Sequence, residues 1–198
     1  VEGWSFAQLK DEISKNNYLE YTLNSLKNDE IMTRIGKSGE HPEGRFFPET
    51  YYFPRGTLDV DFLKRAYALM EERLQKEWEK RGENIAVKSP YEALILASIV
   101  EKETALQDEY GKIAGVFTRR LKKGMRLQTD PTVIYGIGES FDGNIRSRDL
   151  RKDTEYNTYT RKGLPPTPIS MPGLQAIQAV LNPEAGEELG VIWRELDT

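Results

Sequence analysis

The side chains that could carry catalysis in this chain are carboxylates, lysines and tyrosines. The sequence has no cysteine and a single histidine, His41. This inventory nearly excludes thiol catalysis, zinc sites built from cysteine and histidine, and Ser-His-Asp chemistry. A catalytic proton must therefore be carried by a carboxylate, a lysine or a tyrosine.

Glu101 is the carboxylate with the most unusual position. It follows the most apolar segment of the chain, Leu94–Val100, in which only Ser98 is polar. A carboxylate at the end of such a helix is partly desolvated, which raises its pKa and suits it to act as a general acid near neutral pH. Taken alone, a Glu near a helix C-terminus is also typical of an exposed end-of-helix residue, so both interpretations stay open.

Glu103, two residues further on, is expected to point away from Glu101. Two helical steps turn a side chain by about 200°, so the two carboxylates cannot flank one bond from the same face. A hydrolysing glycosidase usually needs a second carboxylate about 5 to 9.5 Å from the first. Asp130 and Glu49 are the remaining candidates, and for Asp130 a role as helix N-cap explains the residue without catalysis.

The helix that would carry Glu101 has clear signals at its start. Ser89 is a favoured cap residue, and Pro90 suits the first helical position. Because the following segment is apolar nearly all round, this helix should lie at the centre of the fold.

Further helices are predicted from capping signals and from apolar residues at three- and four-residue spacing. They cover residues 6–14, 59–80, a stretch that ends before Gly124, 130–135 and 173–181. Residues 125–128 are predicted to form a short strand. The expected fold is α+β and helix-rich, with a small sheet and a central apolar helix bearing Glu101. Residues 1–42 are expected to form an N-terminal helical segment that could belong to a small subdomain, and residues 43–198 the catalytic domain.

The composition favours a folded domain with a polar surface. Of the 198 residues, 38% are hydrophobic, 10% aromatic and 30% charged. The formal net charge of -4 gives no electrostatic reason to expect nucleic acid as a partner. The chain begins at Val1 and has no apolar run near the ~18 residues of a membrane span, so we expect a fragment that lacks its signal or anchor.

Three linked motifs follow one another along the chain. They are Ile99-Val100-Glu101-Lys102-Glu103-Thr104, then Gly124-Met125-Arg126-Leu127-Gln128-Thr129-Asp130-Pro131-Thr132-Val133-Ile134-Tyr135, then Tyr156-Asn157-Thr158-Tyr159 with Gly163-Leu164-Pro165-Pro166. Their order and spacing resemble those of the YceG-like family of endolytic murein transglycosylases. The segments Glu43–Tyr51 and Val1-Glu2-Gly3 are also similar to the family's earlier motifs. The family continues past Asn182-Pro183 through a strand, of which Val191-Ile192-Trp193 is expected to be a remnant, so the C-terminal end of the domain is expected to be incomplete.

The resemblance implies an enzyme held in the cytoplasmic membrane by one N-terminal helix, with its catalytic domain on the outer side. Its substrate would be the glycan strands of nascent peptidoglycan, with peptidoglycan synthases as possible partners and no metal or organic cofactor. Glu101 matches the family's acid, which cleaves the bond between N-acetylmuramic acid and N-acetylglucosamine without water and leaves a 1,6-anhydro end. The family pattern places six residues around the glycan: Gln128, Thr129, Asp130, Tyr135, Asn157 and Tyr159.

Three other functions compete with this interpretation. The first is a muramidase-type hydrolase that uses Glu101 with Asp130, and the second is a non-catalytic glycan-binding module of the cell-wall synthesis machinery. The third is an aminodeoxychorismate lyase, a label also given to family members, which would need pyridoxal phosphate on a lysine. Lys102 has no readable context for that cofactor.

Overall fold

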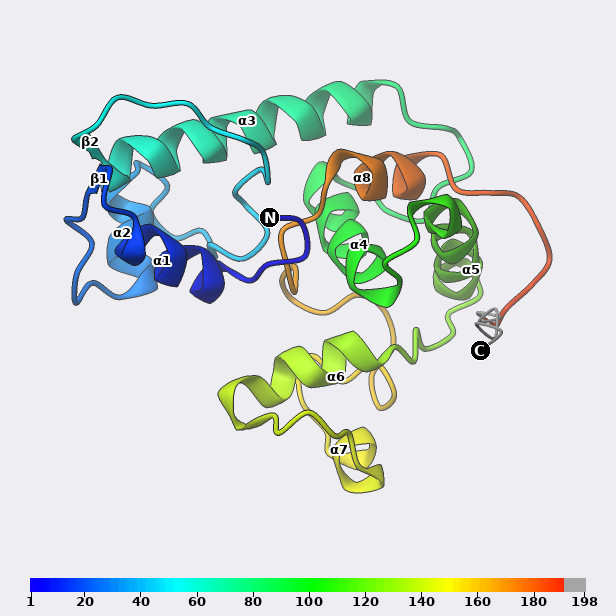
Figure 1. The fold of residues 1–198 in the computed structure, drawn as a ribbon. Helices are drawn as coiled ribbons and strands as arrows, with labels where there is room; N and C mark the ends of the chain where they lie inside the picture. Colours follow the sequence, from blue (N-terminus) through cyan, green and yellow to red (C-terminus); the bar gives the residue numbers. More distant parts are fainter. Residues whose placement is uncertain (191–198) are drawn as a thin grey trace, which may run out of the picture.

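The computed structural model describes residues 1–190 and is built mainly of helices (Figure 1). In chain order these are α1 (Phe6–Lys15), α2 (Asn28–Arg34), α3 (Asp59–Glu79), α4 (Pro90–Glu103), α5 (Tyr110–Lys122), α6 (Asp130–Ile137), α7 (Ser147–Arg151) and α8 (Leu174–Leu181). Single 3-10 turns, η1 (Gln107–Glu109) and η2 (Gly138–Ser140), precede α5 and follow α6. The predicted strand remnant Val191-Ile192-Trp193 lies outside the described residues. No helix in the described part is long and apolar enough to cross a lipid bilayer.

The predicted small sheet is confirmed as two short parallel strands, β1 (Leu19–Glu20) and β2 (Thr57–Leu58). Leu19 pairs with Thr57 and Glu20 with Leu58. The buried carboxylate of Asp59 accepts bonds from the amide nitrogens of Thr22 (2.6 Å) and Leu23 (2.9 Å), which holds the chain after β1 against the start of α3. The expected α+β, helix-rich class is therefore confirmed.

The residues predicted to cap the N-termini of α1 and α4 make the expected hydrogen bonds. In α1 the Ser5 side chain accepts from the amide of Gln8, whose own side chain accepts from the Ser5 amide. In α4 the Ser89 hydroxyl accepts from the amide of Glu92, and Pro90 is the first helical residue. All eight residues from Ala93 to Val100 are buried, so α4 is the central helix of the fold.

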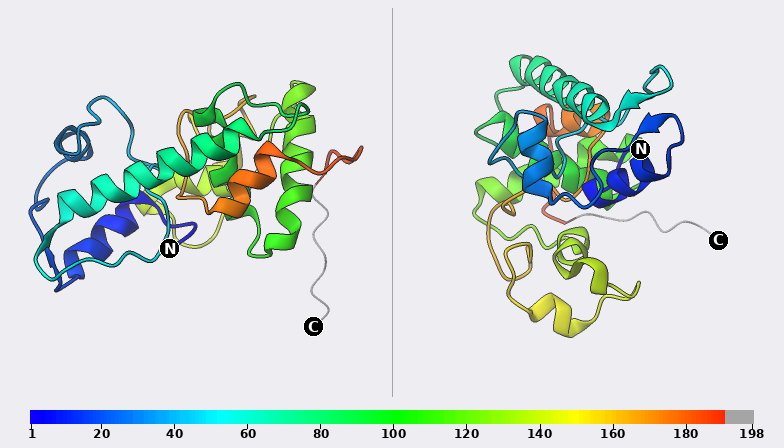
Figure 2. Two further views of the ribbon diagram at one scale, coloured as in Figure 1. Left: turned by 90° about the horizontal axis from the view of Figure 1, so that it is seen from above. Right: turned by 90° about the vertical axis from the view of Figure 1, so that its left-hand side faces the viewer.

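Two hydrophobic cores share the long helix α3. The first core lies under its N-terminal half, where α1, α2, Phe46 and Met171 pack against Leu63 and Tyr67. The second is formed by α4, α5 and α8 with Met70 and Leu74 of α3. Figure 2 shows from above how α3 runs along the molecule from α1 toward α8. The first core takes side chains from both sides of residue 42, and the division of the chain at that residue stays a prediction.

Helices α6 and α7 form a lobe at the edge of the second core, against which Tyr135 of α6 packs (Figures 1 and 2). The chain returns from this lobe to α4, where the Ser98 hydroxyl accepts from the amide of Ile169 (2.9 Å). The Ser170 hydroxyl donates to the carbonyl oxygen of Ser98 (3.1 Å). The one polar residue of the apolar segment therefore anchors the chain that leads into α8.

The strand predicted at residues 125–128 is wrong. These residues form no regular element, and Gln128 has a φ of 54°. A left-handed conformation interrupts extended pairing, since a non-glycine residue in a strand needs a negative φ. The amide of Gln128 donates to the carbonyl oxygen of Thr158 (3.1 Å), which lies in a turn, so this bond is not part of a strand ladder.

Candidate active site

Glu101 lies near the C-terminal end of α4 and is half-buried. One carboxylate oxygen accepts from the hydroxyl of Tyr110 at the start of α5 (2.9 Å). The other accepts from the backbone amide of Gly173, the N-cap of α8 (2.9 Å). Three helices therefore position this carboxyl group, which is not the freely exposed end-of-helix residue of the alternative interpretation.

Burial raises the pKa of Glu101 above its ordinary value. Desolvation is the largest cause, and the negative charge of Glu2 adds to it. The bonds from Gly173 and Tyr110 and the positive charge of Lys102 act in the opposite direction. A carboxyl group that keeps its proton closer to neutral pH can serve as a general acid.

A cavity of about 520 Å³ opens beside Glu101. Its walls come from the N-terminal segment, the end of α4 and the start of α5: Val1, Glu2, Gly3, Glu101, Lys102, Glu103, Thr104, Ala105, Gln107 and Tyr110. This volume lies within the range of ligand-binding pockets, which is about 300–1,000 Å³. The acid therefore faces a space that a sugar unit can enter.

Glu103 lines the same cavity but has its own partner. Its carboxylate accepts from the hydroxyl of Thr129, which precedes α6. Glu101 binds groups of α5 and α8 instead, as expected from the turn between the two residues. Burial also raises the pKa of Glu103. Glu103 thus ties α4 to the start of α6.

Thr129, Asp130 and Tyr159 lie together around this start of α6, and Gln128 lies next to them. Thr129 is buried, and its amide donates to the hydroxyl of Thr158 (3.1 Å). The predicted N-cap role of Asp130 is wrong, because Thr129 occupies the cap position and Asp130 is the first helical residue. The Asp130 carboxylate instead accepts from the hydroxyl of Tyr159 (2.6 Å). The side chain of Gln128 is exposed.

Tyr135 lies further along α6 and faces the N-terminal part of the chain. Its hydroxyl donates to the carboxylate of Glu43 (3.0 Å), and its ring packs against Tyr156 with 4.8 Å between centroids. The other oxygen of Glu43 accepts from the amide of Phe6 (2.9 Å). Glu43 is only 4% exposed, and burial raises its pKa to about 7. Tyr135 therefore joins α6 to the start of α1.

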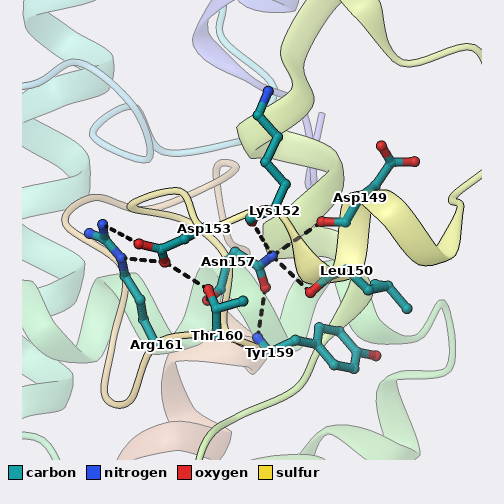
Figure 3. Close-up of polar contacts among 8 residues, drawn as sticks. All are labelled: Asp149, Leu150, Lys152, Asp153, Asn157, Tyr159, Thr160 and Arg161. Carbon is teal, nitrogen blue, oxygen red and sulfur yellow. Dashed lines mark hydrogen bonds and ion pairs between the residues drawn. The ribbon is translucent and has the colours of Figure 1, made fainter.

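Asn157 is 1% exposed and uses its side chain inside the protein (Figure 3). Its amide group donates to the carbonyl oxygens of Asp149 (3.2 Å), Leu150 (3.1 Å) and Lys152 (2.7 Å). Its own oxygen accepts from the amide of Tyr159 (2.8 Å). Asn157 thus connects the C-terminal end of α7 to the segment that carries Tyr159.

Replacing Asn157 by Ala is expected to destabilise the protein by about 2 kcal/mol, because three partly buried carbonyl groups lose their donor and the buried side chain is removed. Urea denaturation of both proteins measures the change. Asn144→Ala is the matched control, since Asn144 is exposed and should change the free energy of unfolding by less than about 0.5 kcal/mol. Equal effects of the two substitutions would contradict the role assigned to Asn157.

Sequence reasoning missed four contributors to this region: Glu2, Glu43, Tyr110 and Gly173. A usable signal existed for the two acids, because each precedes a glycine, in Glu2-Gly3 and Glu43-Gly44. Both glycines have a positive φ, of 74° and 75°. The chain turns sharply at both glycines, where the Glu43 side chain is buried and the Glu2 side chain is exposed at the cavity. Tyr110 and Gly173 carry no comparable local signal.

Lys102 has a contact of its own. Its amino group donates to the carbonyl oxygen of Gly3 (3.4 Å), beside the cavity. Among residues 1–190, no group of three or more His, Cys, Asp or Glu side chains is arranged to hold a metal ion.

The chain is similar to known proteins both in sequence and in structure. Residues 1–189 match the YceG-like family. The chain is 34% identical over 184 residues to the endolytic murein transglycosylase of Bacillus subtilis (strain 168), which covers 92% of this chain and 49% of that protein. It is 32% identical over 152 residues to the enzyme of the same name from Streptococcus pneumoniae serotype 2, covering 74% of this chain and 27% of that protein.

The fold is similar to a crystal structure of a YceG-like protein from Listeria monocytogenes. The TM-score is 0.77 at 30% sequence identity, over 98% of this chain and 69% of the other. The chain spans about half the length of the Bacillus relative and less of the Streptococcus one.

Proposed function

The chain belongs to the YceG-like family, and from this premise we propose that it is the catalytic region of an endolytic murein transglycosylase. Two relatives at 34% and 32% identity carry that name. The observation that carries the proposal is the half-buried Glu101 beside a cavity, with its carboxyl group held by Tyr110 and Gly173.

The proposed reaction needs one acid and no water. Protonated Glu101 donates its proton to the glycosidic oxygen as the bond from that oxygen to the anomeric carbon of N-acetylmuramic acid breaks. The C6 hydroxyl of the same sugar then attacks the anomeric carbon and gives its proton to the Glu101 carboxylate. The products are a strand ending in 1,6-anhydro-N-acetylmuramic acid and a strand with a free N-acetylglucosamine hydroxyl, and Glu101 regains its starting form.

Two kinds of role follow for the predicted glycan-binding residues. Gln128, whose side chain is exposed, and the Asp130–Tyr159 pair are proposed to contact the glycan directly. Thr129 is proposed to orient this group, because it binds Glu103 beside the cavity. Tyr135 and Asn157 have their polar atoms engaged with protein groups, so we assign them to holding α6 and the segment around Tyr159 in place.

The substrate, the location and the partners of the protein are also proposed from its membership of the family. The substrate is peptidoglycan of the cell envelope, and the full-length protein is anchored in the cytoplasmic membrane with this region on the outer side. Peptidoglycan synthases, which make the strands, are the expected protein partners.

Mass spectrometry of the fragments released from purified glycan strands tests the proposal. Lytic transglycosylation gives anhydro ends that are lighter by one water than the reducing ends left by a hydrolase. We expect anhydro ends alone. Reducing ends would favour the hydrolase that uses Glu101 with Asp130, and binding without any cleavage would favour a glycan-binding module.

A further inference from the structure

Residues 1–3 form part of the wall of the cavity. The amide of Gly3 donates to the carbonyl oxygen of Met171 (2.8 Å), and the amide of Met171 donates to that of Trp4 (2.8 Å). These reciprocal bonds fasten the N-terminal segment to the chain that leads into α8. The amino group of Lys102 adds a bond to the carbonyl oxygen of Gly3 (3.4 Å).

Gly3 provides the turn that follows Glu2, whose side chain is exposed and lines the cavity. Its φ of 74° is a left-handed conformation that other residues adopt only with strain. A β-carbon there would lie 3.9 Å from the γ-carbon of Glu101 and 3.7 Å from the δ-carbon of Lys102, so the backbone passes directly along the end of α4.

Glu2 and Glu101 approach the same residue, Gly173. A β-carbon on Gly173 would lie 2.0 Å from a carboxylate oxygen of Glu2, so this carboxylate occupies the space that a side chain there would need. The amide of Gly173 donates to Glu101 (2.9 Å). Both acids also line the same cavity. The structure therefore brings a second carboxylate beside the proposed acid.

The charged and titratable groups around Glu101 come from two other segments and from its own helix. They are Glu2 from the N-terminal segment, Lys102 and Glu103 from α4, and Tyr110 from α5, while α8 contributes the backbone amide of Gly173. The negative charge of Glu2 adds to burial in raising the pKa of both Glu101 and Tyr110. Two acids in different environments are a common arrangement for keeping one of them protonated.

We propose that Glu2 is a functional carboxylate of this site, placed across Gly173 from Glu101 on the wall of the same cavity, where its negative charge acts on the Glu101 carboxyl group. Glu2 is a positioning residue in this role, because it acts through Glu101. The functional meaning of the role rests on the proposed function, whereas the coupling between the two carboxyl groups can be measured without any substrate.

Carbon-13 NMR titration of the glutamate carboxyl groups tests the coupling directly. The Glu101 signal is assigned by its absence in Glu101→Gln. In Glu2→Gln we expect the pKa of Glu101 to fall by about 0.5 to 1 unit at low salt, and by less as salt screens the charge. Glu20→Gln is the matched control, because it removes the same charge from an exposed position in β1 and should leave that pKa unchanged.

Gly173→Ala tests the geometry. Gly173 has a φ of -75° and a ψ of 172°, which alanine adopts without strain, and its amide stays in place for Glu101. The added methyl group would displace the end of the Glu2 side chain. We expect the pKa of Glu101 to fall as in Glu2→Gln, with no further fall in the double variant. Tyr110→Phe should raise that pKa, because it removes a bond that favours the carboxylate.

The pH dependence of glycan cleavage completes the test. Activity should decline at high pH as Glu101 loses its proton, and this decline should move to lower pH in Glu2→Gln by the shift seen in the titration. An unchanged pKa of Glu101 in Glu2→Gln would overturn the inference even in an active enzyme. If the wild-type chain released no anhydro ends, the proposed function would fail, and the titration would still decide whether the two carboxyl groups are coupled.

Discussion

Replacing Glu101 by Gln is expected to lower the rate of glycan cleavage by about 1,000-fold, the usual scale of a general acid's contribution. Gln has nearly the shape of Glu but carries no proton that it can transfer. The Gln oxygen can still accept from the amide of Gly173, and its NH2 group can donate to the hydroxyl oxygen of Tyr110, so the site should keep its shape. The rate is measured as anhydro ends released from purified strands under single-turnover conditions, and strand binding is measured separately.

Glu72→Gln is the control for this experiment. Glu72 is exposed on α3, and replacing it by Gln changes the net charge by the same amount as Glu101→Gln does. The Glu72→Gln protein should therefore keep the wild-type rate. A Glu101→Gln protein with full activity would remove Glu101 from the mechanism. A protein that neither binds nor cleaves would show that the substitution disturbs the site rather than the proton transfer.

The second large effect concerns stability. Burial raises the pKa of Glu43 to about 7 from 4.5, so between these values the folded protein keeps a proton that the unfolded chain has released. The stabilisation is complete below pH 4.5 and is lost as the pH rises through 7. The loss amounts to about 3 kcal/mol, because each pKa unit corresponds to about 1.4 kcal/mol.

Glu43→Gln removes this dependence, since Gln stays neutral at every pH. We expect the variant to gain about 3 kcal/mol relative to wild type between about pH 4.5 and about pH 8.5. Urea denaturation of both proteins at the two pH values measures the difference. Comparing the proteins with each other cancels the pH dependence of the remaining groups. Parallel stability curves would show that Glu43 is ionised in the folded protein across this range.

The protonation state of Glu43 also bears on the hydrogen bonds that hold helix α6. The carboxyl group joins the amide of Phe6 at the start of α1 to the hydroxyl of Tyr135 in α6. It is thus the direct polar connection between the N-terminal core and the helix that begins beside Thr129. The Tyr135 side chain, for which the family pattern suggested contact with sugar, is part of this connection.

The elements that could be predicted are those whose signals are local. The start of α4 needed only Ser89, Pro90 and the apolar run behind them, and the start of α1 needed only Ser5 and Gln8. Caps and helical periodicity act over about four residues, so they can be recognised from neighbours in the sequence. Two predictions failed, the strand at residues 125–128 and the N-cap role of Asp130, and both concern residues that are held by a distant part of the sequence. Gln128 and Asp130 are both held by the 158–159 segment, about thirty positions away, and two favoured cap residues stand side by side at Thr129-Asp130.

The central apolar helix, the carboxylate at its end and the lack of a same-face carboxylate partner on that helix can all be recognised from the amino-acid sequence. The groups that surround this carboxylate depend on the tertiary structure. Gly173 lies 72 positions from Glu101, Tyr135 lies 92 positions from Glu43, and Glu2 lies 99 positions from Glu101. Such contacts depend on how two cores and a lobe pack together, and desolvation, which raises the pKa of each buried acid, arises only from that packing.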